Sequence, residues 1–191
     1  MNEKLKFRLP TAEDAAEYIS YRQAFLDAGS SMDGTGPMRR TPNPMEWLAI
    51  NAQYADPATV PEGKVQSTQF VCERVSDGRI VGMLQVRLAL NDFLLHYGGH
   101  IGYEVYEAYR GHHYAARAVT LLCLLAKQHG FSFLWITCNP ENIASRKTCE
   151  RAGGVLEAVE ELPKDNDMYE KGERRKCIYR FWLEDGKKDV Q

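Results

Sequence analysis

Short stretches in which hydrophobic and polar residues alternate predict β-strands in the first half of the chain. The clearest pair of strands is joined by Asp77-Gly78, a dipeptide typical of a tight β-hairpin. Helical spacing of apolar residues predicts two helices, and the first opens with Thr11 and Asp14 in the manner of a capping box. The expected strands lie at 5–9, 69–75 and 79–88, and the expected helices at 11–28 and 44–55.

The segment between these helices, residues 29–45, is rich in glycine, proline and other turn-forming residues. Gly29 is expected to end the first helix, because glycine adopts the left-handed conformation that helix ends require. The composition of the rest predicts a mobile loop, and such loops often carry function.

The second half of the chain alternates strands with helices. The helix at 113–129 is apolar on most faces, which predicts that it is buried. Asn139 and Pro140 predict the start of a further helix, which Gly153-Gly154 ends. The expected strands lie at 100–106, 133–138, 155–160 and 176–183, with a loop at 91–99 and a polar turn at 163–175.

This order of elements predicts an α/β (α+β) three-layer fold with a mixed central sheet of about seven strands and helices on both faces. The strand, helix and strand at 100–138 would supply a parallel pair beside antiparallel neighbours. No repeat or composition break marks a second domain. A single domain is therefore expected over 1–184, followed by a flexible tail at 185–191.

Charge and composition narrow the classes of function. The 191 residues include 24 Lys and Arg against 26 Asp and Glu, a formal net charge of −2, which argues against nucleic acid as a partner. The longest apolar stretch, at 115–126, is too short to span a bilayer, so no membrane association is expected. The N-terminus lacks an apolar signal region, which predicts a cytoplasmic protein.

Cysteine and histidine patterns do not favour a metal site. The five cysteines are odd in number and include no Cys-x-x-Cys pair, which argues against a disulfide framework or a zinc knuckle. The histidines that cluster in the sequence have no metal-ligand spacing, and no metal is expected; they are His96, His100, His112 and His113.

The turn at 110–115 has the local properties of an anion site. It lies between a strand and the N-terminus of a helix, where unpaired N–H groups and the positive end of the helix dipole converge. Turns of this kind are common and many bind nothing, so the turn alone identifies no ligand.

Three separated motifs resemble the GNAT family of N-acetyltransferases. They are Gly99-His-Ile-Gly-Tyr-Glu-Val-Tyr-Glu-Ala-Tyr-Arg-Gly-His-His-Tyr-Ala, Ile136-Thr-Cys-Asn-Pro-Glu-Asn-Ile-Ala-Ser-Arg-Lys and Glu150-Arg-Ala-Gly-Gly. The motifs agree with the family in order and spacing, and the likeness extends over most of the chain. The Gly-Gly-His-Ile-Gly-Tyr strand and the Asn-x-Ala-Ser helix start are most similar to a poorly characterised bacterial branch.

The resemblance implies that acetyl-CoA is held where the strands at 100–106 and 132–138 part. Val105 and Tyr106 would meet the pantetheine arm through their backbones, and Asn142 and Ser145 would face the cofactor near its thiol end. The pyrophosphate would lie on the family's loop pattern, here Arg110, Gly111, His112, His113, Tyr114 and Ala115.

Two residues depart from the family pattern. His113 replaces the loop glycine, where its side chain crowds the backbone, although a charged imidazole could add a phosphate contact. Cys149 stands where many members carry the tyrosine that protonates the leaving thiolate, so no general acid can be named. Cys149 is expected to pack within its helix rather than to act as a nucleophile.

A general base is easier to identify. An amine with a pKa of about 10.4 is neutral in only about one molecule in 10³ at pH 7, so transfer benefits from a proton acceptor. Glu104, on the strand beside the expected thioester, is the candidate, and an ion pair with a neighbouring strand is its alternative role. Glu107 and Glu73 are weaker candidates.

The expected function is direct transfer of acetyl from acetyl-CoA to a primary amine of a small-molecule or peptide acceptor. The acceptor would enter between the loop at 29–45 and the strand that carries Glu104. The alternative is an acyl-CoA-binding sensor or interaction module with the same fold and little turnover. Homodimerisation and the identity of the acceptor are left open.

Overall fold

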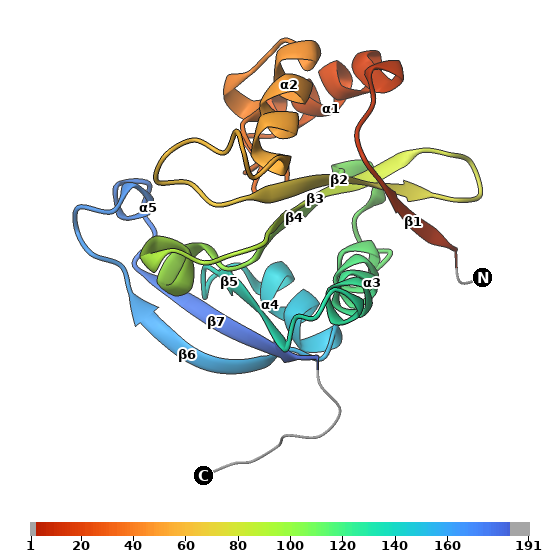
Figure 1. Ribbon diagram of the computed structural model, residues 1–191. Helices are drawn as coiled ribbons and strands as arrows, with labels where there is room; N and C mark the ends of the chain where they lie inside the picture. The colour runs from red at the N-terminus through yellow and green to blue at the C-terminus, as the bar shows by residue number, and fades with distance from the viewer. Residues whose placement is uncertain (1–2, 184–191) are drawn as a thin grey trace. The chain divides into compact units, whose positions relative to one another are not determined.

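The computed structural model describes residues 3–183 (Figure 1). The chain divides into two compact units. The first comprises the residues up to 91 together with 100–115, and the second comprises 92–99 together with the residues from 116 onward. The tail expected at 185–191 lies outside the described residues.

A four-stranded antiparallel sheet in the order β1-β2-β3-β4 forms the base of the first unit. The β2–β3 hairpin turns at Gly78, whose φ of 71° is the left-handed conformation that the Asp-Gly pair predicted. β4 lies at one edge of this sheet, next to β3. The strands are β1 (Leu5–Arg8), β2 (Ser67–Arg74), β3 (Ile80–Arg87) and β4 (Ile101–Val105).

The helices α1 (Ala15–Asp27) and α2 (Pro44–Ala55) lie on the same face of this sheet (Figure 1). α2 begins where it was predicted, because the Asn43 side chain accepts a hydrogen bond from the Met45 N–H at 2.9 Å. The short turns η1 (Ala12–Asp14) and η2 (Met38–Arg40) lead into the two helices. A buried apolar cluster joins the helices to the sheet: Tyr18, Tyr21, Phe25, Met32, Met38, Trp47, Val71, Ile80 and Met83.

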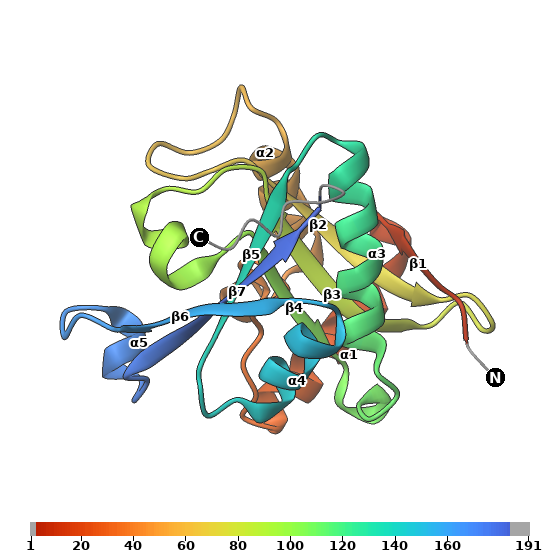
Figure 2. The ribbon, with the colours of Figure 1, turned by 90° about the horizontal axis from the view of Figure 1, so that it is seen from below.

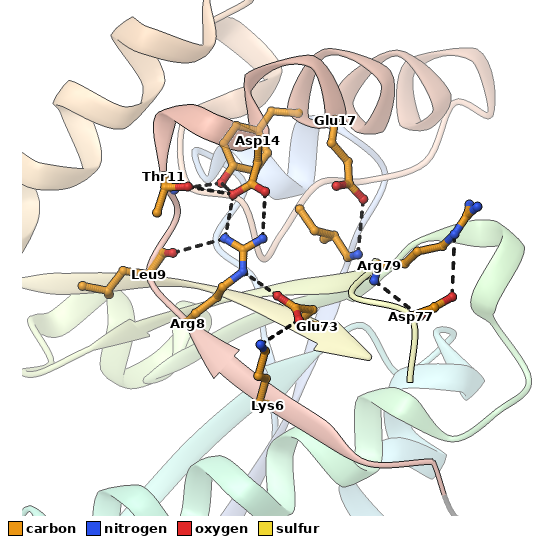
Figure 3. Close-up of polar contacts among 11 residues, drawn as sticks. Lys6, Arg8, Leu9, Thr11, Asp14, Glu17, Glu73, Asp77 and Arg79 are labelled. Carbon is orange, nitrogen blue, oxygen red and sulfur yellow. Dashed lines mark hydrogen bonds and ion pairs between the residues drawn. The ribbon is translucent and has the colours of Figure 1, made fainter. Parts of the chain in front are cut away.

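Arg8 on β1 ties the start of α1 to the sheet (Figure 3). Its guanidinium donates to both oxygens of Asp14, at 2.6 and 2.9 Å, and to Glu73 on β2 at 2.7 Å. The Thr11 hydroxyl also donates to Asp14, at 3.1 Å. Neither Thr11 nor Asp14 caps the backbone with its side chain, so the predicted capping box is wrong.

The predicted mobile loop after α1 is instead a packed segment. Met32, Thr35 and Met38 are buried, and the chain is tied down by side chains from other elements. The Trp47 indole donates to the Thr35 carbonyl at 2.8 Å, and the Gln69 amide donates to the Gly34 carbonyl at 2.8 Å. These contacts connect residues far apart in the sequence, which local composition does not reveal.

A three-stranded antiparallel sheet forms the base of the second unit, with β7 between β5 and β6 (Figure 2). The turn η3 (Leu94–Gly98) is a π-helical turn within the segment expected to be a loop, and α5 lies in the expected polar turn. The elements are β5 (Phe133–Cys138), α4 (Ile143–Arg151), β6 (Val155–Glu161), α5 (Asp167–Glu170) and β7 (Arg175–Trp182).

The helix α3 (Tyr114–Gln128) begins in the first unit and continues in the second. Most of its residues are buried or half-buried, as predicted: Val119 is 0% exposed, and a narrow face that includes Leu124, which is 58% exposed, is open to solvent. α4 begins three residues later than Asn139 and Pro140 predicted. Its cap is Asn142, whose side-chain oxygen accepts the Ser145 N–H at 3.0 Å.

The α/β class and the number of strands agree with the prediction. Among residues 3–183 the strand pairs are all antiparallel and form two sheets, where the strand order had suggested one mixed sheet. In the same part of the chain, no helix combines the length and apolar character that crossing a bilayer requires.

Candidate functional site

Glu104 lies on β4, on the sheet face that α1 and α2 cover. Strand register places Val71 of β2 opposite Met83 of β3, and Met83 opposite Glu104, so the three side chains form a row across the sheet. Val71 and Met83 belong to the buried apolar cluster. The fold therefore puts a carboxyl group at the end of a hydrophobic row.

Burial is the main reason that the pKa of Glu104 is raised from 4.5 to about 9, and the negative charge of Asp33 raises it further. The Tyr21 hydroxyl and the guanidinium groups of Arg110 and Arg39 act in the opposite direction. Both carboxyl oxygens are buried, and neither accepts a hydrogen bond from any described residue. At pH 7 the group is neutral, with a proton affinity in the range of an amine.

The alternative role of Glu104, an ion pair with a neighbouring strand, is not seen among residues 3–183. Glu73 has that role instead. It accepts from Lys6 at 2.8 Å and from Arg8 at 2.7 Å, and these hydrogen bonds lower its pKa although burial opposes the shift. Glu107 is exposed at the start of the turn η4 (Glu107–Tyr109), as its sequence position predicted.

Aromatic rings form one wall of the site. Tyr21 and Phe25, one turn apart on α1, stack with ring centroids 4.9 Å apart, and Tyr106 stacks on Tyr21 at 5.3 Å. The Arg110 guanidinium lies 5.8 Å from the centroid of the Phe25 ring. Tyr21 and Phe25 are 3% and 2% exposed, and this apolar surrounding accounts for the burial of the Glu104 carboxyl.

The backbone at Asp33-Gly34 passes directly over β4. A Cβ atom on Gly34 would lie 2.7 Å from Tyr103 Cα and 2.8 Å from Glu104 N, and one on Gly102 would overlap the Asp33 carbonyl oxygen. Glycine at both positions therefore permits this close approach. The contact brings Asp33 beside Glu104, at the place where the sequence predicted that the acceptor enters.

The two residues expected to meet pantetheine differ in their free backbone groups. The Tyr106 N–H donates to Val81 at 2.9 Å, and the Tyr106 carbonyl accepts from Tyr109 at 2.8 Å. Because N–H directions alternate along a strand, the Val105 N–H points away from β3, toward the outer edge of β4. The Val105 carbonyl also faces outward and accepts from Arg110 Nε at 3.3 Å.

The loop at 110–115 combines an exposed turn with a buried helix start. Gly111 and His113 both have positive φ angles, of 85° and 61°, and His113 is the non-glycine residue with such an angle among residues 3–183. His112 stacks on Tyr114 with ring centroids 5.5 Å apart. Tyr114 itself is buried, and its hydroxyl contacts Glu3 and Arg74, so its side chain serves the fold and its backbone N–H is the group that a phosphate could reach.

Sequence comparison identifies the family. Residues 4–155 match the family described as the acetyltransferase (GNAT) domain. The chain belongs to the GNAT acetyltransferase family. No match was found among curated proteins.

Solved structures show the same GNAT fold. The ribosomal-protein-S5-alanine acetyltransferase from Vibrio fischeri is 19% identical with a TM-score of 0.69, over 96% of this chain and 95% of that one. RimJ from Mycobacterium smegmatis in complex with CoA-disulfide is 22% identical with a TM-score of 0.65, over 93% and 81%. RimL, the ribosomal L7/L12 alpha-N-protein acetyltransferase in complex with coenzyme A, is 14% identical with a TM-score of 0.65, over 93% of each chain.

The GNAT positions in the second unit have defined roles in its fold. Asn142 is exposed and caps α4, and Ser145 lies in the first turn of that helix. Cys149 is 0% exposed, in agreement with the packing role predicted for it. Among the described residues, no group of three or more His, Cys, Asp and Glu side chains could hold a metal ion.

Sequence reasoning missed two features. Tyr21 carries no motif, and only the spacing of Tyr18, Tyr21 and Phe25 along one helix face marks it. Cys138 on β5 has a pKa lowered to about 7, chiefly by a hydrogen bond from Cys149, with burial opposing the shift. Strand register also places Cys177 of β7 opposite Cys138. The sequence motif at 136–147 does not reveal these cysteine neighbours, because they lie on other elements.

Proposed function

We propose that this protein is an N-acetyltransferase that transfers the acetyl group of acetyl-CoA directly to a primary amine. Its family supports the reaction class, and relatives solved with CoA support the co-substrate. Glu104 carries the proposal, because it is a buried carboxyl group without a hydrogen-bond donor among the described residues. Such a group has not spent its hydrogen-bonding capacity on the fold, so it can accept a proton from a substrate amine.

The residues of the first unit fit acetyl-CoA as co-substrate. The outward N–H of Val105 suits the amide groups of the pantetheine arm, which can bind to a strand edge as a further strand would. Gly111 adds no side chain to the exposed turn before α3, where backbone N–H groups suit a phosphate. The remaining residues proposed for the cofactor are Tyr106, Arg110, His112, His113, Tyr114, Ala115, Asn142 and Ser145.

Acetyl-CoA supplies the thioester, and Glu104 supplies the base. The amine nitrogen forms a bond to the acetyl carbon as the carbon–sulfur bond breaks, the Glu104 carboxylate accepts the proton lost by the amine, and the thiolate takes a proton from solvent. With a pKa of about 9, about 3% of Glu104 is ionised at pH 7.5. The rate is therefore expected to rise with pH up to about 9.

The acceptor that we propose is a peptide or small-molecule primary amine. Relatives named for acetylating ribosomal proteins favour a protein N-terminus as the first class to test. An α-amino group has a pKa of about 8, below that of Glu104, so an ionised Glu104 can take its proton without an uphill step.

The test is release of free CoA thiol from acetyl-CoA with four classes of amine: peptides with a free N-terminus, lysine peptides with a blocked N-terminus, amino acids and aminoglycoside antibiotics. One class should release CoA and gain an acetyl group by mass spectrometry. Glu104→Gln should lower kcat by about 10²–10⁴-fold, whereas Glu62→Gln, at an exposed position before β2, should not. If acetyl-CoA raises the melting temperature but no amine releases CoA, the protein is an acyl-CoA-binding module instead.

A further inference from the structure

Tyr21 is held rigidly beside Glu104. Its side chain is 3% exposed, and its ring packs against Phe25 and Tyr106 in a triangle of rings with centroid distances of 4.9, 5.3 and 6.4 Å. Because the ring is buried and contacts both neighbours, moving it out of this cluster would break two aromatic contacts. The hydroxyl position is therefore set by α1 and by the residue that follows β4.

The Tyr21 hydroxyl and both oxygens of Glu104 are buried polar atoms on the same side of the sheet, since Tyr21 packs in one cluster with Met83 and Glu104 is the register partner of Met83. None of the three has a hydrogen-bond partner in proper geometry among residues 3–183. The hydroxyl is nevertheless close enough to favour the charged form of Glu104. Buried polar atoms without hydrogen bonds destabilise a folded protein. A hydrogen bond from the Tyr21 hydroxyl to the ionised Glu104 carboxylate would satisfy one donor and one acceptor together.

The other charged groups that face Glu104 are engaged elsewhere or repel it. Asp33 opposes ionisation. Arg39 donates to the Ser30 carbonyl at 2.5 Å, and Arg110 Nε donates to the Val105 carbonyl at 3.3 Å. Among the groups that act on Glu104, the Tyr21 hydroxyl is thus the neutral hydrogen-bond donor that favours its charged form.

We propose that Tyr21 is a positioning residue for the general base: its hydroxyl donates a hydrogen bond to the Glu104 carboxylate and holds it in the orientation that accepts a proton. The inference rests on the proposed function for its catalytic consequence, but not for the contact itself. Burial and the charge of Glu104 raise the pKa of Tyr21 well above 10, so the hydroxyl keeps its proton and remains a donor while Glu104 titrates.

The contact has a measurable effect on proton affinity. A hydrogen bond to a charged group is equivalent to a shift of about one to two pKa units. Tyr21→Phe removes the hydroxyl and keeps the stacked ring, so the pKa of Glu104 should rise by at least about one unit. Below that pKa the ionised fraction, and with it kcat/KM at pH 7.5, should fall about tenfold, and the loss should shrink as the pH is raised.

The direct test is a ¹³C NMR titration of protein labelled at the glutamate side-chain carboxyl, with the Glu104 signal assigned by its loss in Glu104→Gln. The wild-type midpoint is expected near 9, and the Tyr21→Phe midpoint above it. Tyr18→Phe is the matched control, since it removes a buried hydroxyl of the same helix that donates to Asp14 at 3.0 Å. Its Glu104 midpoint should equal that of the wild type.

Two results would overturn the proposal: a Glu104 midpoint that Tyr21→Phe leaves unchanged, or an equal shift in Tyr18→Phe. If Tyr21→Phe does not fold, incorporation of a fluorinated tyrosine at position 21 gives a stronger donor, and the midpoint must then move down. The titration needs no turnover. A shifted midpoint in a protein that acetylates no amine would refute the proposed function and leave the Tyr21 contact standing.

Discussion

Replacing Glu104 with glutamine should make the protein more stable, and the gain should grow with pH. The folded pKa of about 9 lies above the unfolded value of 4.5, so the native state binds this proton more tightly than the unfolded state does. The stability from that proton is complete below pH 4.5 and is lost as the pH rises toward 9. Glutamine has nearly the same shape and no proton to lose.

The size of the effect follows from the same shift. Within that window each pH unit costs the wild type about 1.4 kcal/mol, which gives about 4 kcal/mol between pH 5 and pH 8 as an upper value. Partial hydration of the ionised carboxylate reduces this, and we expect about 2–4 kcal/mol. The change with pH of the difference in free energy of unfolding identifies the cause. A difference in packing between glutamate and glutamine would be the same at every pH.

Urea denaturation at pH 5, 6, 7 and 8 measures the free energy of unfolding for both proteins. The difference between Glu104→Gln and the wild type should widen steadily over this series. The pH dependence of the wild type should persist in Glu62→Gln, the exposed control. A difference that stays constant from pH 5 to 8 would refute the claim that Glu104 is buried without a stabilising partner.

Two further changes test other parts of the structure. Arg8→Ala should cost about 2 kcal/mol in urea denaturation at pH 7 because Asp14 and Glu73 lose their guanidinium; both carboxyl pKa values are lowered, so this cost should shrink as the pH falls below about 4. His113→Gly should raise stability by about 0.5–1 kcal/mol in thermal unfolding, because it relieves the strain of a non-glycine residue at φ 61°.

Matched variants serve as controls for Arg8→Ala and His113→Gly. Lys171→Ala removes an exposed ion pair with Asp167 at 3.0 Å and should change stability by no more than about 0.5 kcal/mol. An Arg8→Ala cost as small as that would mean that the Arg8 contacts are not stabilising. Gly111→Ala places a side chain at φ 85° in open space and should destabilise. Lower stability in His113→Gly would show that the histidine is not strained.

Elements whose signals are local were predicted well from the sequence. The Asp77-Gly78 hairpin needs only the conformational freedom of Gly78, and α2 needs only the Asn43 cap and Pro44 at its start. The start of α4 was misplaced because Pro140 suits a first helical turn but also suits the turn before it. The hydrogen bond from Ser145 to Asn142 decides between the two, and it exists only once the chain has folded.

The candidate site was predictable in its strand but not in its environment. The motif on β4 singled out Glu104, yet the groups that control its proton come from α1 and from the segment after it. Tyr21 reaches Glu104 because α1 packs on Met83, the register partner of Glu104, and Asp33 reaches it because Gly34 and Gly102 let two backbones touch. Contacts of this kind depend on the tertiary structure, so they cannot be predicted from single residues in the sequence.

Glu73 and Glu104 show why residue type alone does not assign chemistry. Both lie on the same four-stranded sheet, and burial raises the pKa of each. Lys6 and Arg8 reverse that effect at Glu73, which then serves the fold. At Glu104 no described cation forms such a pair, and the raised pKa persists at a cost in stability. A basic neighbour at Glu104 would remove this cost, but it would also lower the proton affinity on which the proposed base role depends.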